Sequence, residues 1–179
     1  MIYLFLASGF EEIEALCPLD LLRRAGLEVT TVGIGGEQIT GAHGITVQAD
    51  IPDGLYADAC PDMIILPGGM PGAKNLDENR TVDAAIKAAA RRGAFIGAIC
   101  AAPFILGKRG LLAGKEAICF PGFEKELQGA TLSQKRVVRD GSIITAAGMG
   151  VALEFGLALV AALKGEAAAE ALRRAVLAD

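Results

Sequence analysis

Cys100 is the side chain best placed in this sequence to act as a nucleophile. It follows the apolar run 94–99, which begins after a glycine and is typical of a buried strand. The segment 101–103 ends in a proline, and the apolar run 104–106 after it fits the first turn of a helix. Cys100 is therefore expected in a sharp strand-to-helix turn, a geometry that exposes a nucleophile at the end of a parallel sheet. The free N–H groups and the dipole at the start of that helix would favour the thiolate.

Glu14 is the carboxyl group expected beside this thiol. In an open α/β sheet the site lies beyond the carboxyl ends of the strands, where the segment 8–14, the loop 67–72 and the turn at Cys100 should converge. An ionised Glu14 would oppose a thiolate, so the pair makes chemical sense when Glu14 is protonated, its pKa raised by burial, and donates a hydrogen bond to sulfur. Plainer interpretations stay open, because buried cysteines are common core residues and a lone glutamate on a helix commonly faces water.

Two glycines and one histidine complete the set of candidate site residues. Gly68 and Gly69 follow the predicted strand 62–66 and could hold an oxyanion with their unobstructed N–H groups. The same pair also fits a tight turn or a phosphate cradle, although the full G-x-G-x-x-G pattern and the P-loop lysine are missing. His43 lies between two glycines, where it is either a surface loop residue or a base that lines the site.

The helix that must position Glu14 is predicted over 10–26 and ends at a glycine. Pro18 is expected to kink or split it, because proline lacks the N–H that an interior helical position needs. Glu11 and Glu12 are expected at the helix start, facing water. The buried face is predicted from apolar residues spaced i, i+4 and i+8, with Glu14 at its edge: Ile13, Cys17 and Leu21.

Strand and helix alternate along the rest of the chain. Strands are predicted over 2–7, 28–33, 62–66, 94–99 and 116–120, and helices over 81–92, 152–163 and 166–178. A short hairpin or an excursion from the sheet is predicted over 38–48, and a hairpin around an Asp-Gly pair over 136–145. This alternation predicts an α/β fold, with a mostly parallel sheet and helices on both faces, as one domain over 1–179.

Composition excludes several classes of function. The net charge of −4 gives no basic footprint for nucleic acid or for an anionic membrane surface. No apolar run approaches the roughly 18 residues of a membrane span, and the first residues lack the basic start of a signal peptide, so a cytoplasmic location is expected. The four cysteines are far apart without a C-x-x-C spacing, and there is one histidine. We therefore expect no disulfide framework, no metal site and no cofactor.

Five motifs in order carry a resemblance to a known family. They are F-E-E-I-E-A (10–15), P-L-D-L-L-R-R-A-G (18–26), L-P-G-G-M-P-G-A-K-N-L (66–76), A-I-C-A-A-P (98–103) and L-E-F-G-L-A-L-V (153–160). The chain resembles the ThiJ/PfpI superfamily over essentially its whole length, and more closely the branch of the Parkinson-associated protein deglycase and its bacterial relatives. The resemblance implies a flavodoxin-like three-layer sandwich, a homodimer without cofactor, and glyoxalase III, protein deglycase or oxidative-stress roles.

By position, the resemblance gives Cys100 the role of nucleophile, Glu14 that of the protonated glutamate, and the amides of Gly69 and Ala101 that of holding an oxyanion. Two departures matter. Phe120 stands where many relatives have a histidine, and His43 where some carry an arginine. Protease-like members place a histidine directly after the nucleophile, where this chain has alanine, and class I amidotransferases need a later His-x-Glu. Because no histidine follows Cys100, both activities are disfavoured.

Two functions from different classes remain. In the first, the Cys100 thiolate attacks the aldehyde carbon of a small 2-oxoaldehyde, or an adduct on a glycated protein or nucleotide, to give a hemithioacetal. Glu14 or water, with His43 as a further candidate, then moves the protons until a hydroxy acid or a repaired amine is released. In the second, the chain is a redox sensor or chaperone, and Cys100 is oxidised to a sulfinate that hydrogen-bonds to Glu14.

Overall fold

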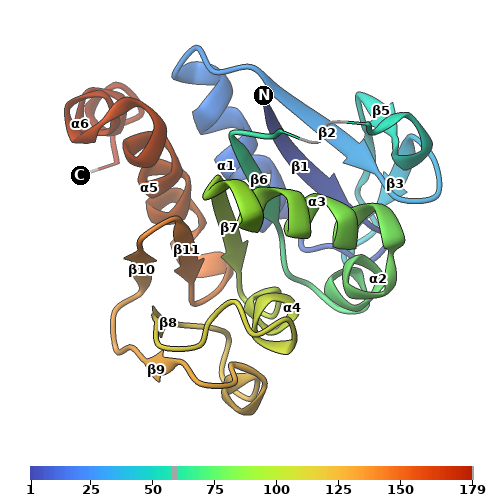
Figure 1. The fold of residues 1–179 in the computed structure, drawn as a ribbon. Helices are drawn as coiled ribbons and strands as arrows, with labels where there is room; N and C mark the ends of the chain where they lie inside the picture. The colour runs from blue at the N-terminus through green and yellow to red at the C-terminus, as the bar shows by residue number, and fades with distance from the viewer. Residues whose placement is uncertain (58–59, 179) are drawn as a thin grey trace.

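The computed structural model describes residues 1–57 and 60–178 (Figure 1). The main sheet contains β1 (Ile2–Leu6), β2 (Val29–Gly33), β5 (Ile51–Pro52), β6 (Met63–Leu66), β7 (Phe95–Ile99), β10 (Val137–Asp140) and β11 (Ile143–Ala146). Two small two-stranded sheets pair β3 (Gln38–Thr40) with β4 (Thr46–Gln48) and β8 (Glu116–Ala117) with β9 (Thr131–Leu132). The helices are α1 (Glu12–Arg24), α2 (Gly72–Glu78), α3 (Arg80–Arg92), α4 (Pro103–Lys108), α5 (Ala152–Lys164) and α6 (Glu166–Ala175). Within the described ranges, no helix is both long and apolar enough to cross a membrane.

The strand order in the seven-stranded sheet is β10-β11-β7-β6-β1-β2-β5. Every neighbouring pair is parallel except β10 with β11, which form the predicted hairpin at one end of the sheet. The central strands β6, β1 and β7 are therefore flanked on both sides, and their carboxyl ends meet at one edge. The predicted α/β fold with a mostly parallel sheet is confirmed.

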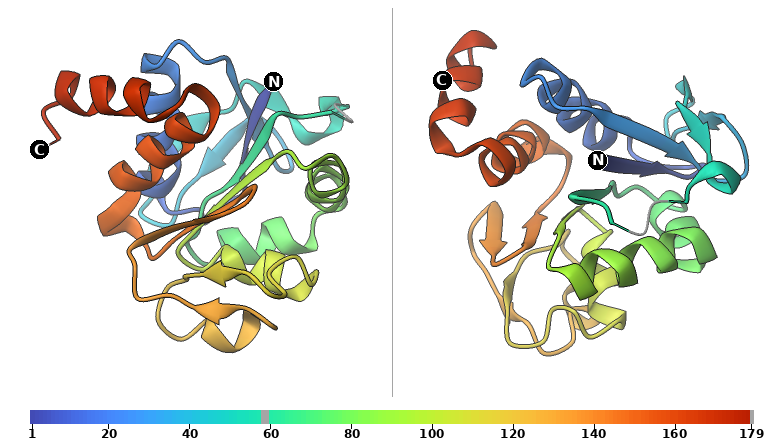
Figure 2. Two further views of the ribbon diagram at one scale, coloured as in Figure 1. Left: turned by 60° about the vertical axis from the view of Figure 1, so that its left-hand side comes forward. Right: turned by 45° about the horizontal axis from the view of Figure 1, so that its top comes forward.

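Alternation along β1 shows how the sheet separates two cores. Ile2, Leu4 and Leu6 belong to one buried cluster, which also contains apolar residues of α1, α5 and α6. Tyr3 and Phe5 belong to the other, which contains apolar residues of α2, α3 and α4. The two views in Figure 2 agree that α1, α5 and α6 cover one face and α2, α3 and α4 the other. The predicted helices on both faces follow from this two-sided burial.

The first helix is continuous, and its buried face differs from the predicted one. It runs without interruption from Glu12 to Arg24, so Pro18 does not split it. A Cβ atom on Gly156 of α5 would lie only 2.6 Å from Leu21 Cδ1 and 3.0 Å from Pro18 Cα, so the two helices pack with almost no space between them. This contact supports α1 at the turn where proline removes a backbone hydrogen bond.

The buried face of α1 is also rotated from the predicted one. Its buried residues are Glu12, Glu14, Ala15, Pro18, Leu21 and Leu22. Ile13, which was expected to face the core, is 50% exposed, and Cys17 is only partly buried. The buried stripe contains two glutamates and a proline, so an assignment based on apolar side chains alone points about 100° away from it.

One helix was not predicted, and one strand is shorter than expected. Helix α2 follows the loop 67–72 directly, but its seven residues are too few to show a helical periodicity in the sequence. The predicted strand 116–120 is reduced to Glu116–Ala117, which pairs with β9. The hairpin over 38–48 forms as predicted, with His43 in the turn between β3 and β4.

Candidate active site

Cys100 occupies the turn between β7 and α4, as the sequence predicts. Its φ of 64° lies in the left-handed region, which a residue with a side chain seldom adopts. Two backbone hydrogen bonds hold the turn. The Cys100 N–H donates to the Ala146 carbonyl at the end of β11 (2.9 Å), and the Cys100 carbonyl accepts from the Phe120 N–H (2.7 Å). Neighbouring segments thus hold the strained backbone at this position.

Glu14 reaches the thiol from the first turn of α1. Its side chain is fully buried (0% exposed), more so than the partly buried position that its place on the helix suggested. Glu14 Oε2 accepts a hydrogen bond from the Gly68 N–H (3.0 Å), and the Glu14 carboxyl group is hydrogen-bonded to the Cys100 side chain. Its Oε1 atom has no hydrogen-bond partner among the described residues. The Cys100 sulfur is the neighbouring group that could accept a hydrogen bond from a protonated Glu14.

Gly68 is the residue that lets the carboxyl group and the thiol meet. A Cβ atom at this position would lie 2.5 Å from Glu14 Oε2 and 2.6 Å from Cys100 Cβ. Both distances are far inside van der Waals contact, so a larger residue would push the pair apart. The Gly68 N–H is bonded to Glu14, and it therefore positions the carboxyl group, in contrast to the expected role of binding a substrate oxygen.

Gly69 and Ala101 bring their amides to the sulfur itself. Both backbone N–H groups hydrogen-bond to the Cys100 side chain, one from the loop after β6 and one from the residue after the turn. Gly69 has a φ of 83°, and a Cβ atom there would lie 2.3 Å from the backbone nitrogen of Glu11. The two amides stabilise a negative charge on the sulfur of a thiolate, or on an oxygen of a group that is bonded to the sulfur.

The electrostatics of Glu14 and Cys100 are coupled. Burial raises the pKa of Glu14 to about 7, and the negative charge of Glu11 adds to the rise, whereas hydrogen bonds from Cys100 and Gly68 oppose it. Burial, followed by the charge and hydrogen bond of Glu14, raises the pKa of the Cys100 thiol to about 12, against the effect of its two amide donors. An ionised Glu14 thus opposes the thiolate, whereas a protonated Glu14 has no charge and donates a hydrogen bond to it. The pair therefore gains its first negative charge as the pH rises through about 7, and the thiolate exists when Glu14 keeps the proton.

Phe120 lies at the rim of the turn. Its backbone bonds to the Cys100 carbonyl, and its side chain is 48% exposed. The ring packs on Gly148, where a Cβ atom would come within 3.2 Å of Phe120 Cδ2. The position expected to border the site does so, and it presents an aromatic ring in place of a titratable side chain.

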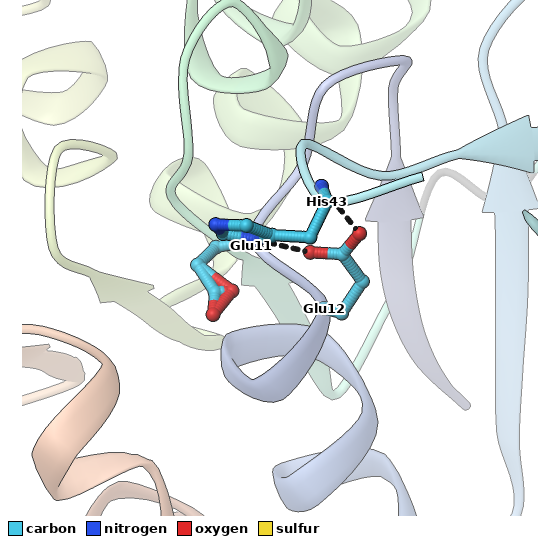
Figure 3. A group of neighbouring side chains, drawn as sticks. All are labelled: Glu11, Glu12 and His43. Atoms are coloured by element: carbon cyan, nitrogen blue, oxygen red, sulfur yellow. Dashed lines mark hydrogen bonds and ion pairs between the residues drawn. The ribbon is translucent and has the colours of Figure 1, made fainter. Parts of the chain in front are cut away.

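His43 lies outside the immediate contacts of the thiol. Its ring is 72% exposed, and Nδ1 is 3.0 Å from Glu12 Oε2 (Figure 3). No hydrogen bond joins it to Cys100 among the residues that the structure describes. The charge of Glu11 influences both groups. It adds to the rise in the pKa of Glu14 that burial causes, and to the rise in the pKa of His43 that Glu12 causes. The sequence analysis named His43 as a candidate site residue, whereas in the structure its side chain pairs with Glu12.

Glu12 is the residue of this region that the sequence did not mark. It was expected in water, but it is 3% exposed and accepts hydrogen bonds from the hairpin turn that carries His43. These contacts hold the pKa of Glu12 below its usual value, although burial opposes them as the largest single influence. Three glutamates within four residues is the available signal, because one helical turn cannot give all three the same surroundings.

Comparisons with known proteins agree with this geometry. The model of the DJ-1/PfpI family matches residues 1–162. The Parkinson disease protein 7 homolog of Danio rerio is 36% identical over 183 residues, with 97% of this chain and 95% of the relative covered. Glutathione-independent glyoxalase DJR-1.2 of Caenorhabditis elegans is 33% identical over 156 residues, covering 87% of this chain and 83% of that protein.

Solved structures give the same result. The structure described as Toxoplasma gondii DJ-1, oxidized, superimposes with a TM-score of 0.94 at 32% identity and covers 98% of this chain and 97% of that one. Drosophila melanogaster DJ-1beta gives a TM-score of 0.93, also at 32% identity, over 98% of this chain and 96% of its own. A family model over most of the sequence, near-complete coverage of the relatives and a shared fold all lead to one assignment. The chain belongs to the DJ-1/PfpI family, and within it to the DJ-1 branch.

Proposed function

We propose that this chain is a cofactor-independent glyoxalase III or protein deglycase that acts on methylglyoxal-type 2-oxoaldehydes or their adducts through Cys100. The observation that carries the proposal is the buried Glu14 carboxyl group in hydrogen-bond contact with the thiol, with the amides of Gly69 and Ala101 on the same sulfur. Similarity to a relative named as a glutathione-independent glyoxalase supports it. This arrangement supplies a nucleophile, a proton donor and anion-stabilising amides in one place.

The first step forms a bond between sulfur and carbon. The Cys100 thiolate attacks the aldehyde carbon, and the carbonyl electron pair moves to the oxygen. Glu14 donates its proton to that oxygen, which gives a neutral hemithioacetal and leaves Glu14 ionised. The charge that develops on oxygen lies close to the amides of Gly69 and Ala101. A pKa of about 7 lets Glu14 give and recover a proton near neutral pH.

The remaining steps move protons between neighbouring carbons. Ionised Glu14 takes the proton from the former aldehyde carbon, and an enediol forms as the adjacent ketone oxygen gains a proton. The former ketone carbon then gains a proton while the hydroxyl on the sulfur-bearing carbon loses one, which gives a thioester of the 2-hydroxy acid on Cys100. Water attacks the thioester carbon, the carbon–sulfur bond breaks, and the hydroxy acid leaves with the thiolate restored. For the hemiaminal adduct of a glycated amine, the thiolate bonds to the hemiaminal carbon as the carbon–nitrogen bond breaks, and the amine leaves with the proton of Glu14.

The missing imidazole argues for this chemistry over peptide hydrolysis. Phe120 stands at the rim and Ala101 follows the nucleophile, so neither position offers a base to protonate a leaving amine. An aldehyde needs less help, because thiolates add to it reversibly without a leaving group. The half-exposed Phe120 ring also gives the opening an apolar wall, which suits small substrates with an alkyl group beside the carbonyl.

Turnover of methylglyoxal to lactate tests the proposal. Wild type should produce lactate without added glutathione or metal, Cys100→Ser should abolish turnover, and Glu14→Gln should lower kcat because glutamine cannot transfer a proton. Cys17→Ser, on the partly buried side of α1, is the matched thiol control and should retain activity. Equal rates for wild type, Cys100→Ser and Glu14→Gln would overturn the mechanism.

A second candidate function is redox sensing or chaperone activity through oxidation of Cys100. Similarity to a structure described as oxidized favours it, as does the hydrogen bond that protonated Glu14 could donate to a sulfinate oxygen. Limited peroxide should then oxidise Cys100 selectively over the other thiols, as read by mass spectrometry, in a protein with negligible turnover of methylglyoxal. Rapid lactate production together with indiscriminate thiol oxidation would contradict the sensor function and support only the enzyme proposal.

We also propose that the chain works as a homodimer, as its family resemblance implies. Ile13 on α1 and Leu153 at the start of α5 are large apolar side chains at or above 36% exposure, and these two helices pack side by side. A second copy on this face would bury them. Light scattering of the purified chain should give twice the mass of 18.4 kDa, and a monomer at micromolar concentration would contradict the proposal.

A further inference from the structure

A separate cluster of metal-ligating side chains lies at the start of α1. Glu11, Glu12 and His43 each contribute one ligand atom, and these atoms all lie within 4.8 Å of one another. Figure 3 shows the two glutamates at the amino end of the helix and His43 coming to them from the hairpin turn. The cluster joins two segments that are about 30 residues apart in the sequence. It uses none of the atoms that contact Cys100.

Glu12 is held in the orientation that a metal ligand needs. Its Oε1 atom accepts the His43 N–H (2.8 Å) and the Ile45 N–H (3.4 Å), which leaves Oε2 directed at His43 Nδ1 (3.0 Å). Gly41 makes room for this carboxylate, because a Cβ atom there would lie 2.3 Å from Glu12 Oε1. Backbone donors that fix one oxygen while the other stays available are the usual outer support of a ligating carboxylate.

The hydrogen bond between Glu12 and His43 does not account for the side chain of Glu11. Its Oε2 atom is buried and has no hydrogen-bond partner among the described residues. Within the same residues, the ion pair that reaches the cluster is the one from His43 to Glu12, and no lysine or arginine pairs with either carboxylate. A buried, unpartnered carboxylate oxygen beside a second carboxylate is unfavourable unless a positive charge is supplied.

We propose that Glu11, Glu12 and His43 form a binding site for one divalent cation of the zinc class, with water in the remaining coordination positions. One imidazole nitrogen and two carboxylate oxygens suit a borderline metal such as Zn²⁺ or Co²⁺ better than Ca²⁺ or Mg²⁺, which prefer oxygen alone, or Cu⁺, which prefers sulfur. The two carboxylates balance the two charges of the ion. The exposed ring of His43 leaves the site open to the solvent from which the ion would come.

The spacing of the ligand atoms is close to what such an ion requires. At bond lengths of about 2.0–2.2 Å, two ligands of a tetrahedral zinc ion lie roughly 3.4 Å apart. His43 Nδ1 and Glu12 Oε2 are already 3.0 Å apart, and the widest spacing in the cluster stays within 4.8 Å. Rotation of the exposed His43 ring and the Glu11 side chain can remove the remaining difference, while Glu12 stays on its backbone donors.

Titration of the full chain with Zn²⁺ or Co²⁺ tests the site. The measurements use a Cys100→Ser background, so that the reactive thiol cannot bind the metal and the result is independent of the proposed glyoxalase activity. Calorimetry should show one ion per chain, and His43→Gln and Glu12→Gln should each weaken binding at least about tenfold. Glu28→Gln, which removes an exposed carboxylate on another part of the surface, is the matched control and should bind as before.

The spectrum of the Co²⁺ complex separates this site from adventitious thiol binding. Nitrogen and oxygen ligands give visible d–d bands without the near-ultraviolet charge-transfer absorption of a cobalt thiolate. Circular dichroism of each variant checks that it is folded, and His43→Gln keeps the backbone N–H that supports Glu12. Absence of binding or a thiolate spectrum would overturn the proposal. Equal affinity of the folded His43→Gln variant and of the same Cys100→Ser background with His43 retained would also overturn it.

Discussion

Replacing Glu14 by glutamine should make the protein more stable at alkaline pH and leave its stability almost unchanged at acid pH. Glutamine keeps the shape of the side chain, can accept the Gly68 N–H, and can donate to the Cys100 sulfur as the protonated acid does. The substitution therefore removes one property, the ability to ionise in a buried position. The fully buried side chain gives that property a large energetic weight.

The sign and size follow from the raised pKa of Glu14. The group titrates near 4.5 in the unfolded chain and at about 7 in the folded protein, so between these values the unfolded state has released a proton that the folded state retains. The free energy of unfolding of the wild-type protein therefore has its full value below pH 4.5, and it falls as the pH rises through 7. At about 1.4 kcal/mol per pKa unit, the loss by pH 8 is at most about 3 kcal/mol, of which under about 1 kcal/mol has occurred by pH 5. Cys100 shares the charge, but the proton count of the pair is the same whichever atom releases it.

Urea unfolding of wild type and Glu14→Gln at pH 5 and pH 8 measures the effect. The variant should gain about 2–3 kcal/mol over wild type at pH 8, near a hundredfold in the unfolding equilibrium, and much less at pH 5. Glu28→Gln is exposed and should show no such dependence. A Glu14→Gln protein that is equally or less stable than wild type at pH 8, or that differs from it by the same amount at both pH values, would refute the assignment of a buried acid at this position.

Three further changes probe the site and its support. Gly68→Ala should lower turnover by about 100-fold, because its Cβ atom would displace the reacting groups, whereas Gly54→Ala, with no atom within 4 Å of the new Cβ, should keep full activity. Asn79 caps α3 by accepting the N–H groups of residues 81 and 82, so Asn79→Ala should lower the free energy of unfolding by about 0.5–2 kcal/mol, as read from denaturant curves. Phe120→His should raise kcat and give a rate that falls below about pH 6.5 as the imidazole is protonated. A Phe120→His enzyme no faster than Phe120→Leu would show that this rim position takes no part in proton transfer.

The turn at Cys100 could be predicted from the sequence because its determinants are adjacent in the chain. An apolar strand, a run of small residues and a proline specify a strand-to-helix turn with little reference to distant segments. Its approach to Gly68 follows from the pairing of β6 with β7, where Leu66 lies opposite Ala98, so two residues further on Gly68 and Cys100 are neighbours. The contact with Glu14 followed from the same rule that parallel strands end at one edge.

What escaped prediction depends on contacts between distant segments. Glu12 is buried because a hairpin turn about 30 residues later covers it, and its own neighbours in the helix give no sign of that turn. Ile13 is exposed because α5 packs on the adjacent stripe of α1. The role of Gly68 as the support of a carboxyl group, in place of an oxyanion donor, required the direction of one N–H bond. Periodicity identifies a face of a helix but cannot tell what will lie against it.

The two ends of the main sheet determine how copies of this protein can meet. At one end β5 has only two residues, and Pro52 has no N–H group to offer to an additional strand. At the other end β10 carries the charged residues Arg139 and Asp140, and the Asp140 carboxylate accepts the N–H of Glu116 in β8, which lies beside that edge (Figure 1). Neither edge is a template for continued strand pairing, so intermolecular sheets and the aggregates that grow from them are blocked at both ends. Two copies of the chain are therefore not expected to associate by continuing the main sheet.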